Sequence, residues 1–332
     1  MKPFRTAALA LCLAAPAAAG VDEAIDRHVL PGLAAFAAAT ETLAQNAEAD
    51  CRPEALQPAF QAAFDAWMRV ADLRLGPSET GALSIAFWPD ARGFTPRTLS
   101  GLIADQDPVA RDAAAYAEVS IAARGLFALE MLLYDEAFAG YDAESYTCAL
   151  VTTVARDLDG QADALVTVWA QDYADTLRSA GEPGNATFLT EDEAIRALYT
   201  QILSGLQFTA DQRLGAPMGT LDRPRPARAE ARRSARSLRN VVLAAEAAHD
   251  LAAALAEGLT DGDLPQTAAA MERVRAAAQA VDDPAFQDVT DPQARLHAEV
   301  LQQAVRGLRD AIGAELGAPL GIAPGFNSQD GD

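Results

Sequence analysis

One carboxylate in this chain occupies a position where carboxylates are rare. The segment from Gly125 to Tyr134 reads Gly-Leu-Phe-Ala-Leu-Glu-Met-Leu-Leu-Tyr, and Glu130 is its only charged residue. Apolar side chains surround a helix of this sequence on nearly every side, which predicts a buried helix. A buried carboxylate is costly unless it is paired, protonated or bound to a metal. Glu130 is therefore a candidate ligand contact or, with a raised pKa, a candidate general acid or base.

Two other parts of the sequence are unusual. Gly125 is predicted to lie within the helix, where glycine costs about 1 kcal/mol relative to alanine, so we expect it to let a ligand or another backbone come close. The segment Phe-Trp-Pro-Asp at 87–90 places Trp88 and Asp90 in an irregular stretch, where binding residues often gather. An aromatic plug that ties a loop to the core is an equal alternative for Trp88.

A cluster of seven arginines within seventeen residues is dense for an acidic chain. The cluster consists of Arg223, Arg225, Arg228, Arg232, Arg233, Arg236 and Arg239. Four-residue steps place Arg228, Arg232, Arg236 and Asn240 on one stripe of a predicted helix. Guanidinium groups bind carboxylates and other oxyanions, so the cluster is either an anion-binding face or a solvated one. For residues 236–240, which include Ser237, we favour a functional role over a solvated surface, because Arg236 or Asn240 could be the partner that Glu130 requires.

The common enzyme signatures are absent. The chain has no His-Glu-x-x-His pair, no phosphate-binding glycine loop and no Gly-x-Ser-x-Gly elbow. The three histidines, His28, His249 and His297, lack a set of ligand partners at helical spacing. Glu246 three residues before His249 is a weak exception. We interpret all three histidines as surface or capping residues.

The amino terminus predicts export. Residues 1–19 combine a charged start, an apolar run from Ala7 to Ala15 and a small-residue cleavage pattern that ends at Ala19, which together are typical of a signal peptide. Its removal leaves Cys51 and Cys148, and in an oxidising compartment we favour one disulfide over two separate thiols. No later segment approaches the roughly 20 apolar residues of a membrane span. The formal net charge of −21 argues against binding to nucleic acid or anionic lipid.

Apolar residues recur at helical spacing almost throughout, which predicts an all-α protein. Its length predicts two helical-bundle domains, residues 22–183 and 184–332, divided at the break Gly181–Asn185. The expected helices are 23–46 with a kink or break at Pro31-Gly32, a helix ending near 75, 96–104, 108–137, 143–180, 190–214, about 30 residues after 226, 265–281 and 291–316. Residues 76–95 and 215–226 are expected to be mostly irregular.

Together these segments resemble the imelysin family. The family marker is Gly-x-His-x-x-Glu on a helix, followed by Leu-Leu and an aromatic residue. It stands here as Gly125 to Glu130, followed by Leu-Leu-Tyr at 132–134. Three further segments look like family features: 87–90, 236–240 and 325–332.

The resemblance implies two helical-bundle domains with a site between them, a location in the bacterial envelope and a link to iron acquisition. The family was first described as a metallopeptidase. In this chain Phe127 replaces the marker histidine, and phenylalanine can neither bind a metal nor transfer a proton. A catalytic zinc usually has three protein ligands, so Glu130 keeps no co-ligand on its own helix.

We therefore expect a periplasmic, non-catalytic binding protein associated with iron acquisition, whose ligand is an iron complex, haem or a peptide. The expected site residues between the domains are Trp88, Asp90, Gly125, Phe127, Glu130, Arg236, Ser237 and Asn240. One alternative is a metallopeptidase-like hydrolase that uses Glu130, with Asp90 supplying an oxygen to the metal. The other is a structural envelope protein in which Glu130 belongs to a buried ion pair.

Overall fold

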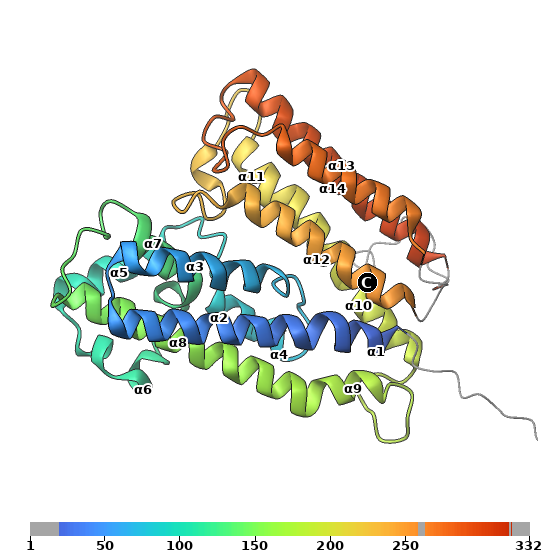
Figure 1. The fold of residues 1–332 in the computed structure, drawn as a ribbon, viewed down its shortest axis with the longest axis horizontal. Coiled ribbons are helices and arrows are strands. Elements are labelled where there is room, and N and C mark those ends of the chain that lie inside the picture. Colours follow the sequence, from blue (N-terminus) through green and yellow to red (C-terminus); the bar gives the residue numbers. More distant parts are fainter. Residues whose placement is uncertain (1–19, 258–262, 319, 321–332) are drawn as a thin grey trace, which may run out of the picture.

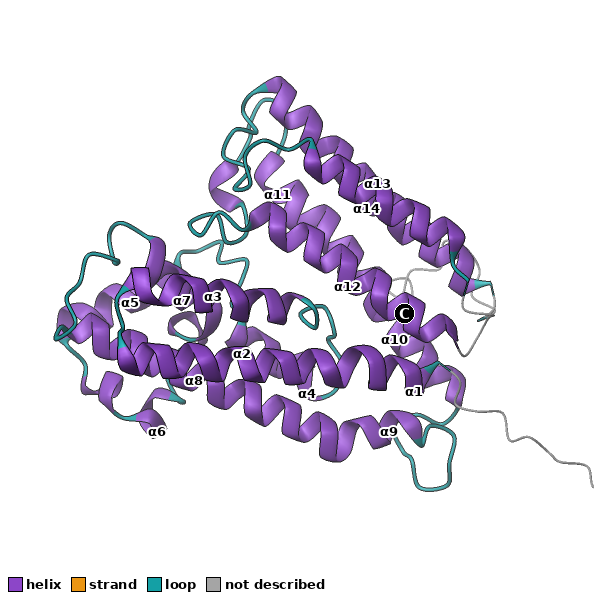
Figure 2. Ribbon diagram, in the orientation of Figure 1, coloured by secondary structure: helices purple, strands orange, loops and turns teal. Residues whose placement is uncertain are grey.

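The computed structural model describes residues 20–257, 263–318 and 320. Within these ranges the chain forms helices joined by turns and loops, without β-strands (Figures 1 and 2), so the all-α prediction is confirmed. None of the helices in these ranges is long and apolar enough to cross a membrane. The predicted signal peptide 1–19 and the closing segment 325–332 lie outside the described residues.

The helices up to Arg178 form a first group. They are α1 (Val21–Ala24), α2 (Leu30–Ala49), α3 (Pro53–Met68), α4 (Pro77–Ile85), α5 (Phe94–Asp105), α6 (Ala113–Tyr116), α7 (Gly125–Tyr134), α8 (Tyr146–Val168) and α9 (Ala174–Arg178). Helix α2 packs against α3 on one side and α8 on the other, along the long axis of the molecule (Figure 1). Cys51, just before α3, forms the predicted disulfide with Cys148 at the start of α8, with the two Cα atoms 5.4 Å apart.

The remaining helices form a second group. They are α10 (Glu191–Phe208), α11 (Gly215–Met218), α12 (Ser237–Glu257), α13 (Pro265–Gln279) and α14 (Pro292–Gly317). Helices α13 and α14 pair along their length, and α10 and α12 pack beneath them. The predicted break at Gly181–Asn185 lies between α9 and α10, as expected. Whether each group is a separate domain stays a prediction.

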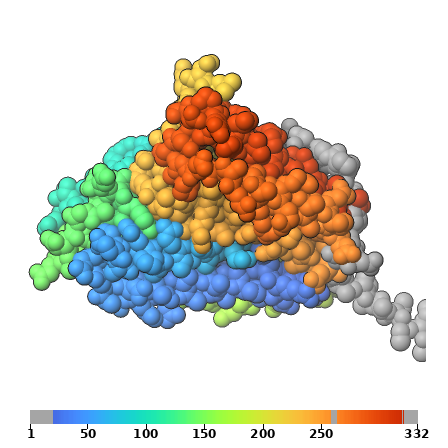
Figure 3. All heavy atoms as spheres, turned by 45° about the horizontal axis from the view of Figure 1, so that its top comes forward, coloured from blue at the N-terminus to red at the C-terminus, as the bar shows by residue number. Residues whose placement is uncertain are grey.

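The two groups meet along a surface that we call the seam. Helix α12 packs there against α1 and α3, and the space-filling view shows α12 lying directly on the first group (Figure 3). Its buried face carries mostly alanine, including Ala244, Ala245 and Ala252. Small side chains let helices approach closely, and one continuous cluster of buried apolar residues runs through both groups.

Several predicted helix boundaries were wrong. Residues 76–95 contain a regular helix, α4, and the helix that carries Glu130 begins at Gly125 instead of residue 108. Short helical turns precede it, and two of them start where the side chains of Asp112 and Ser120 accept backbone N–H groups. Gly125 has a φ of +70°, a left-handed conformation that a continuous helix does not contain. The local caps and this glycine therefore divided a stretch whose apolar spacing alone predicted one helix.

The helix is not broken at Pro31-Gly32, where the sequence predicted a kink or break. The helix runs without a break from Val21 to Ala49, and a π-helical turn at Ile25–Val29 lies just before Pro31. Proline lacks the N–H group and its ring collides with the carbonyl four residues earlier. We infer that the wider turn accommodates the ring.

Candidate functional site

Helix α7 is buried on all sides, as its sequence predicted. Every residue from Gly125 to Leu133 is buried, because α3, α4, α5 and α8 all pack against this helix. A Cβ atom on Gly125 would lie 2.1 Å from the carbonyl oxygen of Ile85 and 2.4 Å from that of Ser84. The expectation that Gly125 admits another backbone is confirmed, although it opens the helix and does not lie within it.

Glu130 finds a partner that the sequence did not reveal. Its side chain is 2% exposed, and Oε1 accepts hydrogen bonds from the backbone N–H of Ser234 at 3.0 Å and from the Ser234 hydroxyl at 2.9 Å. The prediction of Arg236 or Asn240 as this partner was wrong. The residues directly before α12 form turns and not an α-helix, and Ala231 and Ala235 have left-handed φ values of +46° and +54°. The turns at Ala231 and Ala235 place Ser234 within hydrogen-bonding distance of Glu130. A regular helix through these residues would instead have carried the predicted stripe of arginines.

The electrostatics of Glu130 follow from these contacts. Burial raises the pKa of Glu130 above its ordinary value, while the Ser234 donors and the more distant charge of Arg233 act in the opposite direction. Arg233 itself pairs with Asp135 at 2.5 Å. Glu130 is therefore a carboxylate held by uncharged donors, in a place that favours its protonated form.

Arg236 connects α12 to the first group. It is 1% exposed, and its Nη2 lies 2.7 Å from Oδ1 of Asp65 on α3. Its Nη1 donates to the carbonyl of Gln61 at 3.1 Å, and its guanidinium lies 4.5 Å from the ring centroid of Phe64. Arg239 pairs with the same Asp65. Arg236 therefore serves the seam and not Glu130.

A second buried glutamate, which the sequence analysis missed, extends these contacts. Glu230 is 4% exposed, and its Oε2 accepts from Nε of Arg213 at 3.0 Å and from Nδ2 of Asn240 at 3.0 Å. Arg213 also pairs with Asp72, just beyond α3, at 3.1 Å, and Ser237 donates to the carbonyl of Glu230. Glu230 is the only acidic residue within the arginine cluster, and that isolation was the signal that could have identified it.

We call this linked set the arginine network. Its members are Asp65, Asp72, Arg213, Glu230, Arg236, Arg239 and Asn240. Three arginines face three carboxylates, so the formal charges balance across the seam. The stripe of arginines predicted on one helix does not exist, because α12 begins only at Ser237.

Aromatic side chains from both groups meet beside α7. Phe127 is 8% exposed, and the ring of Trp88 stacks on it with centroids 6.4 Å apart and planes at 19°. Phe208 at the end of α10 meets Trp88 edge-on at 5.8 Å. Asp90, in contrast, takes no part, since its carboxylate accepts the backbone N–H groups of Phe94 and Thr95 and caps α5.

The residues present do not form a metal centre at Glu130. No group of three or more His, Cys, Asp or Glu side chains is placed to hold a metal ion within the described part of the chain.

The prediction of a surface or capping role was wrong for His28, which is 7% exposed with its Nε2 3.0 Å from the carbonyl of Arg69. Burial lowers the pKa of His28, which favours the neutral ring.

Comparison with known proteins identifies relatives over almost the whole chain. The family model described as Imelysin matches residues 29–312. The crystal structure of an imelysin-like protein from Psychrobacter arcticum 273-4 aligns with a TM-score of 0.74 and 19% identity, covering 92% of this chain and 96% of that one. A protein from Parabacteroides distasonis ATCC 8503, named as an iron-regulated protein A precursor, aligns with a TM-score of 0.69 and 14% identity over 89% of this chain and 93% of that one. Among curated proteins, none matches the sequence significantly.

Proposed function

This chain belongs to the imelysin family, and on that premise we propose that it is a secreted envelope protein associated with iron acquisition, which binds a ligand at the seam and does not catalyse. The neighbour named as an iron-regulated protein A precursor supports the link to iron. The pattern of residues 1–19 supports export to the periplasm.

The observation that carries ligand binding is the aromatic stack beside α7. Trp88 keeps part of its indole accessible while Phe127 supports its face and Phe208 supports its edge from the second group. Partly exposed aromatic rings at the junction of two packed groups are frequent elements of ligand sites. Their flat apolar faces suit an iron complex with organic ligands, haem or a peptide side chain.

The donor set argues against the metallopeptidase alternative. Phe127 occupies the marker position three residues before Glu130, and the described residues supply no cluster of metal-binding side chains. Oε1 of Glu130 already accepts two hydrogen bonds from Ser234. A catalytic metal therefore does not fit the residues at Glu130, and we derive no hydrolytic step there.

Calorimetric titration of the purified chain with ferric citrate, haem and a hydroxamate siderophore tests the proposal. We expect saturable binding of one of these ligands. The Trp88→Ala variant should bind it roughly fivefold more weakly, because stacking on an aromatic face is worth about 1 kcal/mol. Phe94→Ala, which removes an exposed ring on α5, is the matched control and should bind normally. Failure of all three ligands to bind, or equal binding by Trp88→Ala, would refute the proposal.

The contacts of Glu130 favour a second candidate, a structural envelope protein in which Glu130 joins the two groups. Its two hydrogen bonds come from a residue 104 positions away, in the segment that leads into α12. In that case Ser234→Ala should lower the free energy of unfolding and leave every titration unchanged. Weaker ligand binding by Ser234→Ala at an unchanged fold would favour the binding function instead.

A further inference from the structure

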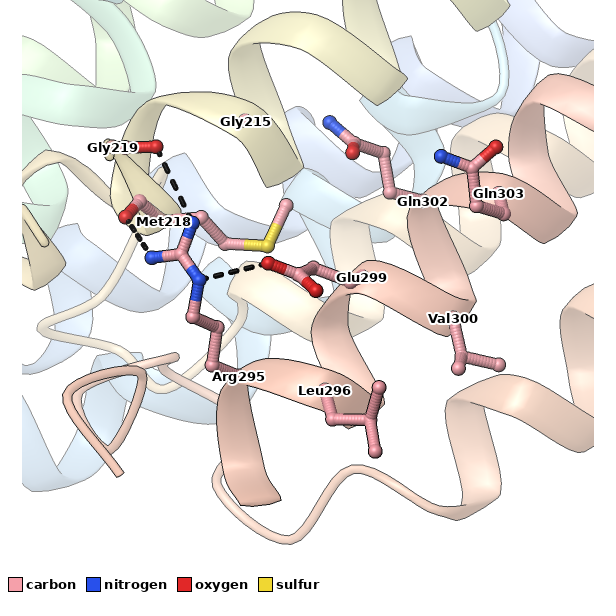
Figure 4. Close-up of a pocket in the computed structure, with 9 residues that line it drawn as sticks. All are labelled: Gly215, Met218, Gly219, Arg295, Leu296, Glu299, Val300, Gln302 and Gln303. Carbon is pink, nitrogen blue, oxygen red and sulfur yellow. Dashed lines mark hydrogen bonds and ion pairs between the residues drawn. The ribbon is translucent and has the colours of Figure 1, made fainter. Parts of the chain in front are cut away.

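A hollow of about 480 Å³ opens between α11 and α14 on the second group (Figure 4), and Glu130 is not among the residues that line it. Arg295 braces one wall, donating to the carbonyl of Met218 at 2.6 Å and to Glu299 at 2.8 Å. Because Glu299 neutralises Arg295, the wall it forms offers little free charge. The residues that line the hollow include Met218, Gly219, Arg295, Leu296, Glu299 and Val300.

Exposed apolar side chains gather at this hollow. Leu296 is 56% exposed and Val300, one turn later on α14, is 50% exposed. Leu221 is 78% exposed and follows Thr220, whose carbonyl accepts from Arg295. Only seven large apolar side chains are strongly exposed in the described chain, and these three belong to one region. Such a concentration marks an interaction surface, whereas single exposed apolar residues need no explanation.

Three arginines beside the hollow lack carboxylate partners. Arg223, Arg225, Arg228 and Arg232 form no ion pair with any described residue, whereas Arg233, Arg236 and Arg239 of the same cluster do. The Arg225 side chain lies against the rim, since its Cγ would be 3.3 Å from a Cβ atom on Gly219. Arg223 pairs through its backbone with Thr220, and the turn Pro226–Arg228 packs on α11, so the first three arginines of the cluster lie beside the hollow.

We propose that this surface docks an acidic peptide segment of a partner protein. A large apolar side chain of the segment enters the hollow between Met218, Leu296 and Val300, and its carboxylates pair with Arg223, Arg225 and Arg228. Guanidinium groups pair well with carboxylates, and residues 223–228 carry three arginines without an ion pair to any described residue in a chain of net charge −21. At physiological ionic strength the screening length is about 8 Å, so the local arginines outweigh the distant acidic surface.

Fluorescence anisotropy with a defined probe tests this docking site. The probe is a labelled synthetic peptide in which aspartates flank a Leu-Phe pair, titrated with the purified full chain. We expect saturable binding that the triple variant Arg223→Glu, Arg225→Glu, Arg228→Glu weakens at least about tenfold, because each pair is lost and each charge reversed. Leu296→Ser with Val300→Ser should weaken binding by a similar factor. The control pair Arg92→Glu and Arg111→Glu reverses two charges elsewhere and should leave binding unchanged.

Four results would overturn the proposal. The first is no saturable binding of the probe, and the second is equal binding of a probe with lysine in place of aspartate. The third is sedimentation of the chain with anionic lipid vesicles that the triple variant abolishes, since it would assign the arginines to a membrane. The fourth is concentration-dependent dimerisation lost in the triple variant, which would assign the surface to a second copy of the chain.

Discussion

Glu130 and Glu230 are both buried and both contact the stretch of chain around the start of α12, yet their hydrogen-bond partners differ in kind. Glu130 is 2% exposed and is held by the uncharged donors of Ser234. Glu230 is 4% exposed and is held by Arg213 and Asn240 within the arginine network. The two side chains are almost equally buried, so they differ chiefly in the charge of their hydrogen-bond partners. One glutamate lies in a place that favours its neutral form, while the other belongs to a charge-balanced cluster that joins α12 to the first group.

This difference separates two tasks at the seam. The arginine network joins residues of the second group to Asp65 and Asp72 of the first, and removal of one member leaves its partners buried and unpaired. The Glu130 contact is smaller and can gain or lose a proton without loss of a cation. We therefore expect the network to dominate stability and Glu130 to dominate the response to pH.

The largest expected effect follows from Arg213→Met. This change leaves Glu230 and Asp72 without their cation, and breaking a buried pair typically costs about 3–5 kcal/mol of unfolding free energy. Urea denaturation measures the loss. Arg275→Met is the control, because Arg275 is 41% exposed and its ion pairs should contribute less than about 1 kcal/mol. Equal losses in the two variants would show that the network does not hold the seam.

Ser234→Ala should cost less, about 1–2 kcal/mol. It removes one of two donors to Glu130, and leaving a buried acceptor unsatisfied costs about 1–3 kcal/mol, of which the remaining backbone N–H recovers a part. Urea denaturation again provides the measurement. Ser204→Ala, an exposed serine that bonds only to carbonyls of its own helix, should be nearly neutral. A neutral Ser234→Ala would mean that the backbone donor alone is sufficient.

The Ala235→Gly change should stabilise the chain by up to about 1 kcal/mol. Ala235 has a φ of +54°, and glycine adopts left-handed backbone conformations without the steric cost that other residues incur. Thermal unfolding should show a higher midpoint. Ala38→Gly, in the regular and exposed part of α2, should instead lower stability by about 1 kcal/mol. A loss in both variants would contradict the strain we assign to the Ser234 segment.

The smallest effect at any one pH, and the sharpest contrast, is expected for Glu130→Gln. Because burial raises the pKa of Glu130, its contribution to stability is present below the ordinary glutamate pKa and is lost as the pH rises through the folded-state pKa. Glutamine keeps an oxygen acceptor for Ser234 and does not titrate. The variant should therefore gain stability relative to the original chain as the pH rises, in urea denaturation from about pH 4 to about pH 8.

Asp65→Asn should show the opposite trend. Burial acts against ionisation of Asp65, but hydrogen bonds from Arg239 and Arg236 hold its pKa below the ordinary value. Its contribution is present above the ordinary aspartate pKa and is lost as the pH falls through the folded-state pKa. The cost of Asp65→Asn should thus be greatest at neutral pH. Parallel trends in Asp65→Asn and Glu130→Gln would remove the distinction between the two regions.

The site was predictable in part, and the reasons are particular to each residue. The burial of Glu130 followed from the apolar residues around it, whereas the contacts of Trp88 with Phe127 and Phe208 could not be read from the sequence. The sequence did not distinguish a ligand contact from a cap for Asp90, and in the structure its carboxylate accepts the N–H groups of Phe94 and Thr95. Arg236 was expected to reach Glu130 because four-residue spacing assumed a helix that begins only at Ser237.

By itself the sequence determined what depends on local spacing and on counting. It predicted an all-α chain, a helix buried on every side and a disulfide between Cys51 and Cys148, because helical periodicity and an isolated pair of cysteines are properties of the chain itself. Only the tertiary structure decided which donor reaches Glu130. That contact joins residues 104 positions apart, and its geometry depends on two left-handed alanines that carry no signal in the sequence. A hydrogen bond is sensitive to shifts of less than an ångström, whereas burial is sensitive only to which face of a helix is apolar.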